Sequence, residues 1–183
     1  QRKGCVVTVL EKQPRLLSLF QGCTKRWLHP RVYDWPTPGS LDADARLPVL
    51  NWQADQAGEV ARTLTSAWET LRAESGDRLQ LYCRVEVEPP TRDGDRFHLA
   101  WNAPYQTGDF DIIIIAVGFG SERSLDTLSA KSYWLDDSLD QSDGSASIFV
   151  SGLGDGGLTD FVRACIAGFR HDEIVERLGL GAI

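Results

Sequence analysis

The sequence has 183 residues, of which 42% are hydrophobic and 25% charged, so its length and composition suit one ordinary globular domain spanning 1–183. The net charge of −7, with Lys and Arg scattered along the chain, argues against a nucleic-acid surface, which requires clustered basic residues. The strongest apolar run, IIIIAV, is much shorter than the roughly 20 residues that a membrane-spanning helix needs, so we expect no membrane segment.

The four cysteines lie far apart, without a C-x-x-C pair or a matching histidine spacing. This usage predicts neither a metal site nor a disulfide framework, and it is typical of a reducing compartment, so we expect a cytoplasmic protein. Cys5, Cys83 and Cys165 lie in apolar stretches and are expected to be buried, whereas Cys23 lies in a more polar segment.

The first half of the chain predicts one strand, one long loop and one helix. CVVTVLEK (5–12) is typical of a strand buried on both faces, as in parallel sheets. Residues 13–50 form a long loop rich in proline and tryptophan. The prolines prevent a regular helix, and the tryptophans provide apolar surface. Apolar residues then recur at helical spacing from about Asp55 to Glu74, and Gly76 ends this helix.

The second half predicts strands at 79–89 and 96–102, joined by a turn at 92–95. A fully apolar strand is expected at 109–120, and a polar loop at 119–147 follows it. The chain then predicts a strand in SIFV (147–150), a glycine turn, the helix LTDFVRACIAGF and a short helix around DEIVERL.

The glycine turn GLGDGG (152–157) fits the dinucleotide-binding pattern G-x-G-x-x-G between a strand and a helix. That fingerprint also requires a parallel strand ending in Asp or Glu about 20 residues later, but helices are predicted after Gly157. Glu11, by contrast, ends a buried strand, as the ribose-binding acid of such a unit does. Its own glycine loop is therefore expected upstream of Gln1, and the absence of methionine also leads us to expect a piece of a longer protein.

Three motifs in order, VVTVLEK (6–12), DIIIIAVG (111–118) and IFVSGLGD (148–155), resemble the FAD domain of glutathione-reductase-like flavoprotein oxidoreductases. The resemblance implies a Rossmann-like FAD/NAD(P)-binding α/β fold, in which a parallel sheet carries a small antiparallel β-meander. The G-x-G-x-x-G segment and the central first strand are absent from the sequence, so we expect an N-terminal segment of the same protein to supply them. The loop at 119–147 occupies the place where related enzymes insert a second domain.

The same resemblance implies a cofactor site for FAD, with NAD(P)H left open as the electron donor and no metal. Glu11 corresponds to the acid that binds the adenosine ribose, and Lys12 lies beside it. The backbone near Val85 corresponds to the adenine contact. The stretch Ala116-Val117-Gly118 matches an A-T-G pattern, with Val117 in place of the usual threonine. The residues that hold the pyrophosphate and ribityl part of FAD in this family correspond to Gly152, Gly154 and Asp155.

The residues that carry chemistry are less defined. His29, Tyr33 and Asp34 are weak candidates for acid, base or substrate ligand, and Arg26 or Arg31 for contact with an anionic substrate. The alternative, which we favour, is that this loop packs on itself and its polar groups bind loop backbone.

The resulting hypothesis is a FAD-dependent oxidoreductase domain that transfers electrons or hydride through flavin to an unknown small-molecule substrate. One alternative is a non-catalytic nucleotide-binding or interaction module that retains the fold. A dehydrogenase that uses NAD(P) alone is disfavoured, because no strand is predicted after the final glycine turn.

Overall fold

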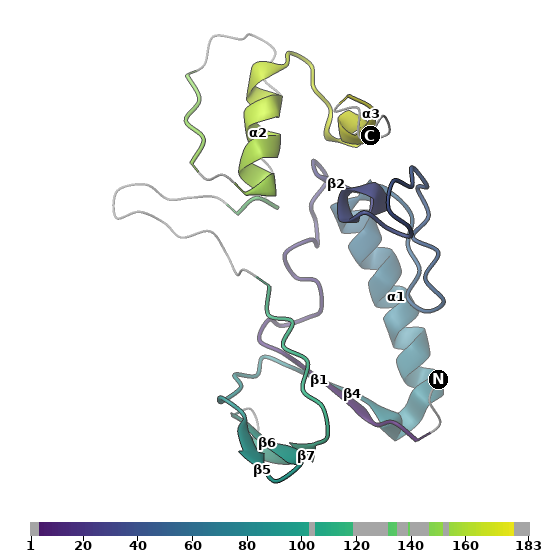
Figure 1. Cartoon of the computed structure of the whole chain (residues 1–183), viewed down its shortest axis with the longest axis vertical. Helices are drawn as coiled ribbons and strands as arrows, with labels where there is room; N and C mark the ends of the chain where they lie inside the picture. Colours follow the sequence, from purple (N-terminus) through teal and green to yellow (C-terminus); the bar gives the residue numbers. More distant parts are fainter. Residues whose placement is uncertain are drawn as a thin grey trace. The chain divides into compact units, whose positions relative to one another are not determined.

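The computed structural model describes residues 4–102, 105–118, 132–134, 139, 147–151 and 154–177 (Figure 1). The chain divides into two compact units, the first made of 1–18 and 65–121 and the second of 19–64 and 122–183. The single domain over 1–183 stays a prediction. Gly152 and most of the loop predicted at 119–147 lie outside the described residues.

A parallel pair of strands forms the sheet of the first unit. β1 (Val7–Glu11) pairs with β4 (Leu79–Cys83) in a register that runs from Val7 opposite Leu79 to Glu11 opposite Cys83. The strand predicted at 79–89 is therefore shorter, because Arg84 has a φ of 60° in the left-handed region and turns the chain out of the ladder. In the described part of the chain, the other edge of β1 has no strand partner.

An antiparallel meander completes this unit: β5 (Thr91–Asp93), β6 (Arg96–Asn102) and β7 (Tyr105–Phe110). The predicted turn at 92–95 exists, but it joins β5 to β6, since Gly94 takes the positive φ of the hairpin. Val85, Leu99 and Trp101 form the buried cluster of the unit, and Leu10, Tyr82, Phe110 and Ile113 pack around it.

The prediction of one strand over 109–120 is wrong for the described residues. Asp109 and Phe110 end β7, and residues 112–118 continue without a ladder. Ile112, Ile114, Ile115 and Val117 are 75%, 84%, 73% and 83% exposed. An apolar run is buried only when neighbours cover both faces, and here Ile113 packs inward while these four side chains do not.

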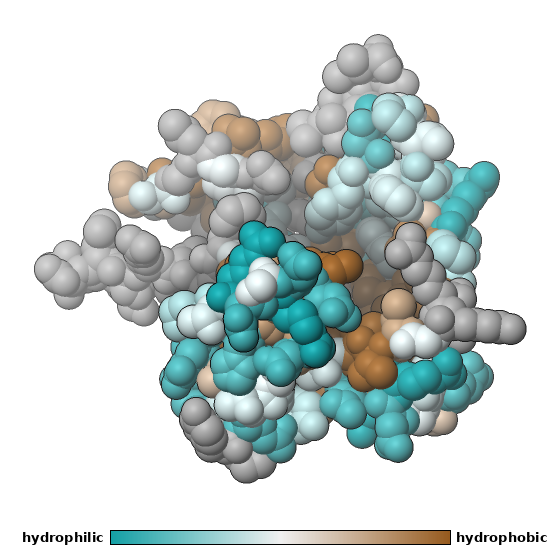
Figure 2. Space-filling view, turned by 60° about the horizontal axis from the view of Figure 1, so that its bottom comes forward, coloured by the Kyte–Doolittle hydropathy of each residue, from teal (hydrophilic) through white to brown (hydrophobic). Residues whose placement is uncertain are grey.

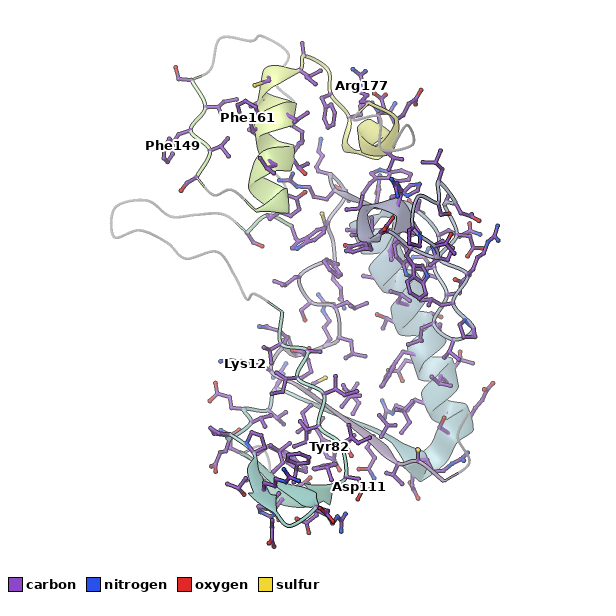
Figure 3. All side chains as sticks on the ribbon, in the orientation of Figure 1. Lys12, Tyr82, Asp111, Phe149, Phe161 and Arg177 are labelled. Carbon is purple, nitrogen blue, oxygen red and sulfur yellow. The ribbon has the colours of Figure 1, made fainter. Side chains whose placement is uncertain are left out.

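The strand predicted in SIFV (147–150) is also not formed. These residues are irregular, and Phe149 is 79% exposed (Figure 3). Exposed apolar surface is visible beside hydrophilic surface in the space-filling view (Figure 2).

The described residues confirm a mixed α/β structure with a small parallel sheet and antiparallel strands, but the parallel part has only β1 and β4.

The second unit contains most of the predicted long loop. Within it, β2 (Trp27–Leu28) pairs with β3 (Asp55–Gln56), and the 3₁₀ turn η1 (Pro30–Tyr33) follows β2. Its core consists of Cys23, Leu28, Ala57 and Val60, with Trp134 among the side chains packed around it. The prediction that Cys5 and Cys165 are buried was wrong, because both are exposed, and Cys83 is only partly buried; Cys23, from the more polar segment, is buried.

Helices follow the predicted pattern, with shifted ends. α1 (Ala57–Ser75) matches the expected amphipathic helix, and η2 (Gly76–Arg78) leads from it into β4. α2 (Asp155–Cys165) begins before the predicted Leu158, because the helix already starts after Gly154. η3 (His171–Glu173) and α3 (Ile174–Arg177) form the short C-terminal helix. Among the described residues, every helix is too short or too polar to cross a bilayer.

The start of α1 is held by backbone contacts with the loop. Ala57 N–H donates to the carbonyl of Arg26 at 2.7 Å, and Gly58 N–H donates to the carbonyl of Cys23 at 2.9 Å. These bonds satisfy two of the amides that a helix start leaves without an internal acceptor. A Cβ on Gly58 would lie 2.9 Å from the Cys23 carbonyl oxygen, so glycine permits this close approach.

We predict that Gly58→Ala lowers the free energy of unfolding by about 1–3 kcal/mol, because the new methyl group would push Cys23 away from α1. This result would oppose the intrinsic helix preference for alanine, which favours the substitution by about 1 kcal/mol. Chemical denaturation measures the change. Ser66→Ala, at an exposed position of the same helix, is the control, and equal effects of the two substitutions would contradict the packing argument.

Candidate functional site

Glu11 and Val85 lie together at the carboxyl end of the parallel pair. The amide of Val85 donates to the carbonyl of Glu11 at 3.1 Å, and the amide of Arg84 donates to the carbonyl of Gln13 at 3.1 Å. Lys12, labelled in Figure 3, places its Nζ 3.0 Å from Glu86 Oε1, and both side chains of this ion pair are exposed. Three residues predicted for the adenosine half of the cofactor are thus brought together.

The Glu11 carboxylate is already engaged by its own chain. Its Oε1 accepts a hydrogen bond from the Gln13 amide at 2.7 Å, which turns the side chain toward the segment after β1. Binding of two ribose hydroxyls would require this bond to be shared or replaced. Val85 is only 1% exposed, and its amide already donates to the Glu11 carbonyl, so neither its side chain nor its amide is open to an adenine in this structure. The predicted adenine contact near Val85 stays a prediction.

The stretch corresponding to the A-T-G pattern also lies in the first unit. Ala116 is exposed, and Gly118 has a φ of 62°, which residues other than glycine adopt at a cost. The backbone can therefore turn sharply at Gly118. The predicted contact of these two residues with a cofactor stays a prediction.

The first turn of α2 has the properties of an anion-binding helix start. Gly154 is the N-cap residue, in extended conformation, and makes no side-chain capping bond. A Cβ built on Gly154 meets nothing within 4 Å, so the space beside it is open. Free amides and the positive end of the helix dipole favour a phosphate or carboxylate at such a position. Asp155 begins the helix, and its side chain is outside the described part of the structure.

The predicted cofactor residues are distributed over both units. Glu11, Lys12, Val85, Ala116 and Gly118 belong to the first unit, and Gly154 and Asp155 belong to the second. The convergence of Glu11 and Asp155 on one dinucleotide therefore stays a prediction.

Two of the three weak catalytic candidates have a structural role in the loop. His29 caps η1, and its Nδ1 accepts the Arg31 amide at 3.0 Å. Asp34 Oδ1 accepts bonds from Arg31 Nη1 at 2.7 Å and from the Gly39 amide at 2.9 Å. Tyr33 is exposed, and its ring makes a T-shaped contact with the ring of Trp52. This arrangement agrees with the favoured alternative, in which polar loop groups bind loop backbone.

The cluster formed by buried Arg26 with the half-buried Tyr133 and Asp160 was not predicted as a unit. Arg26 is 1% exposed, and its Nη1 lies 2.5 Å from Asp160 Oδ1. Its Nε donates to the Tyr133 carbonyl at 2.9 Å. The suggestion that Arg26 contacts an anionic substrate is not supported, because its guanidinium is enclosed by protein. No local pattern signals this cluster, since Arg26 and Asp160 are 134 positions apart.

A surface groove of about 580 Å³ opens in the first unit between the end of α1 and β4. Glu69, Arg72, Asp77, Gln80 and Tyr82 are among its lining residues, and none of the predicted cofactor residues lines it. In the described part of the chain, no group of three or more His, Cys, Asp or Glu side chains is placed to hold a metal ion.

Comparison with protein-family models, with curated proteins and with solved structures found no match to this chain.

The capping role of His29 predicts a pH dependence. Burial lowers the pKa of His29 below its usual value of 6.5, and the nearby charge of Asp42 opposes this shift in part. Between the folded and unfolded pKa values the unfolded chain therefore binds more protons, so stability rises with pH across this window. Below it, protonation also removes the Nδ1 acceptor of the cap.

We predict that the free energy of unfolding falls as the pH drops below 6.5, and that His29→Asn weakens this dependence, because asparagine caps without titrating in this range. Denaturation at a series of pH values measures the effect. A wild-type slope in His29→Asn would show that other groups cause the loss.

Proposed function

We propose that the chain is the FAD-binding part of an oxidoreductase with a Rossmann-like FAD/NAD(P)-binding fold. The observation that carries this proposal is the position of Glu11 beside Val85 at the carboxyl end of the parallel β1/β4 pair. Ligands of open α/β sheets bind outside the carboxyl ends of the strands. A carboxylate there can accept hydrogen bonds from both hydroxyls of a ribose.

The residues of this chain have separate tasks in the proposed site. The Glu11 carboxylate would accept hydroxyl hydrogen bonds, the backbone near Val85 would contact the adenine, and the first amides of α2 would donate to the pyrophosphate. When bound, FAD supplies hydride or electron transfer between a donor, for which NAD(P)H is a candidate, and a small-molecule substrate. The proposal includes a cytoplasmic location, which free Cys5, Cys23, Cys83 and Cys165 support.

The proposal also includes an N-terminal strand from the same protein, paired with β1. Backbone groups alternate along a strand, so every second residue of β1 directs its amide and carbonyl away from β4, to an edge that has no strand partner among the described residues. The apolar run 112–117 lies in the same unit with four large side chains exposed. A strand on this edge would pair these groups and cover apolar surface.

A non-catalytic nucleotide-binding or interaction module is the second candidate. It is favoured by the structural engagement of His29 Nδ1 and Asp34 Oδ1, which leaves these two groups poorly placed to act as acid or base. Such a module would bind the adenosine half of the ligand without flavin redox chemistry.

We predict that the full-length protein purifies with oxidised flavin. Glu11→Gln and Asp155→Ala should each reduce FAD affinity about tenfold or more, because each removes a charged hydrogen-bonding group worth roughly 1.4 kcal/mol or more. Titration of apoprotein with FAD, followed by flavin fluorescence, measures this. Glu88→Gln, at an exposed carboxylate of the first unit, is the control. A colourless protein that binds AMP, and whose affinity for AMP falls in Glu11→Gln, would support the second candidate instead.

The strand partner is tested at Ile114, which is 84% exposed in this structure. A charge there should change the free energy of unfolding by no more than about 0.5 kcal/mol if the residue stays exposed. We predict that Ile114→Lys destabilises the full-length protein by at least about 2 kcal/mol, because the added strand buries this position. Thr107→Lys, at an exposed position of β7, is the control, and equal small effects would refute the strand partner.

A further inference from the structure

Arg26, one of two candidates in the sequence for contact with an anionic substrate, makes contacts in the second unit that the proposed function does not explain. Arg26 binds both oxygens of Asp160, with Nη1 at 2.5 Å from Oδ1 and Nη2 at 3.3 Å from Oδ2. Its Cζ also lies 3.9 Å from the centroid of the Tyr133 ring. A guanidinium used at once as a fork and as a stacking plane is a geometry that lysine cannot reproduce.

The backbone of Arg26 is fixed independently of this side chain. Its carbonyl accepts the Ala57 amide at the start of α1, and Trp27 and Leu28 pair with β3 directly after it. The guanidinium therefore extends from a fixed backbone toward α2, and movement of α2 away from it would break the ion pair with Asp160.

The ring of Tyr133 lies between the Arg26 guanidinium and the first turn of α2. A Cβ built on Gly156 would lie 2.8 Å from Tyr133 Cδ2, so the ring lies directly on the helix backbone at this glycine. Asp160 follows Gly156 by one helical turn and lies on the same side of the helix. Arg26 thus contacts α2 twice, directly at Asp160 and through Tyr133 at Gly156.

We propose that Arg26 is a positioning residue that holds the first turn of α2 in the orientation in which its amides receive the pyrophosphate of the cofactor. This inference rests on the proposed function, and it assigns Arg26 a task in that same site. Gly154 provides no side-chain cap, so the direction of the first amides depends on contacts such as those of Tyr133 and Arg26. Binding groups must be held within roughly 0.5 Å of the productive geometry, which a frayed helix start would not achieve.

The test is a double-mutant cycle for FAD affinity in the full-length protein. Arg26→Lys keeps the charge and removes both the fork and the stacking plane, and Gly154→Ala narrows the approach to the same amides. We expect Arg26→Lys to weaken FAD binding about tenfold in the wild-type background, and less than about threefold in Gly154→Ala. Equal losses in the two backgrounds would mean that Arg26 acts only on general stability, and would overturn the proposal.

Arg163→Lys is the matched control. Arg163 is also buried and lies 3.4 Å from the same Asp160 oxygen, so its loss perturbs the same cluster. The expected result is wild-type FAD affinity in Arg163→Lys. A loss as large as in Arg26→Lys would overturn the specific role of Arg26. If Arg26→Lys does not fold, Asp160→Asn takes its place in the cycle, since it removes the partner charge but keeps the shape.

A second measurement needs no cofactor. The Leu158 amide donates to the Gly154 carbonyl at 3.0 Å, and its hydrogen exchange reports opening of the first turn of α2. We expect exchange about tenfold faster in Arg26→Lys, or in Asp160→Asn if that variant is used, and unchanged exchange in Arg163→Lys. Unchanged exchange in the Arg26 or Asp160 variant overturns the positioning role. If the full-length protein binds no FAD but exchange is faster in the variant, the proposed function is wrong. The contact of Arg26 with α2 would then still hold the first turn of that helix.

Discussion

A parallel pair of strands can be joined only by a crossover, and this constraint organises the first half of the chain. The connection from Glu11 to Leu79 contains the long loop and α1, so the chain leaves β1 at its carboxyl end and returns at the opposite end of β4. Strand pairing then places Glu11 and Val85 together, whereas α1 receives its N-terminal capping from the carbonyls of Cys23 and Arg26. These backbone bonds join positions distant in the sequence and hold Cys23 and Arg26 against the start of α1.

The loop itself is held by polar groups rather than by regular structure. Asp44 Oδ1 accepts the Arg46 amide and the Asn51 side chain, and these bonds lower the pKa of its carboxyl. The Trp35 indole donates to the Ala45 carbonyl at 2.6 Å. Such a network gives Asp44, Asn51 and Trp35 a structural role without assigning chemistry to them. In the proposed flavoprotein, the flavin and not this loop supplies most of the reactivity.

Sequence patterns predicted the local elements better than the contacts between them. β1 and α1 were predicted because their apolar spacing is local, and the pairing of parallel strands makes the position of Glu11 beside Val85 understandable. The end of β4 at Cys83 depends on the left-handed backbone of Arg84, which no side-chain pattern signals. The ion pair of Arg26 and Asp160 joins distant positions, so it follows from packing alone. The apolar run 112–117 was expected in a ladder because its composition is that of a buried strand, but composition does not provide the neighbour that burial requires.

The exposed apolar run also has a consequence for the behaviour of the chain in solution. Two copies that approach through 112–117 would hide these side chains from water, while the net charge of −7 on each copy opposes the approach. Counterions reduce that repulsion, and at physiological ionic strength it decays within about 8 Å. Dilute, low-salt buffer therefore favours separate molecules, and added electrolyte shifts the balance toward self-association.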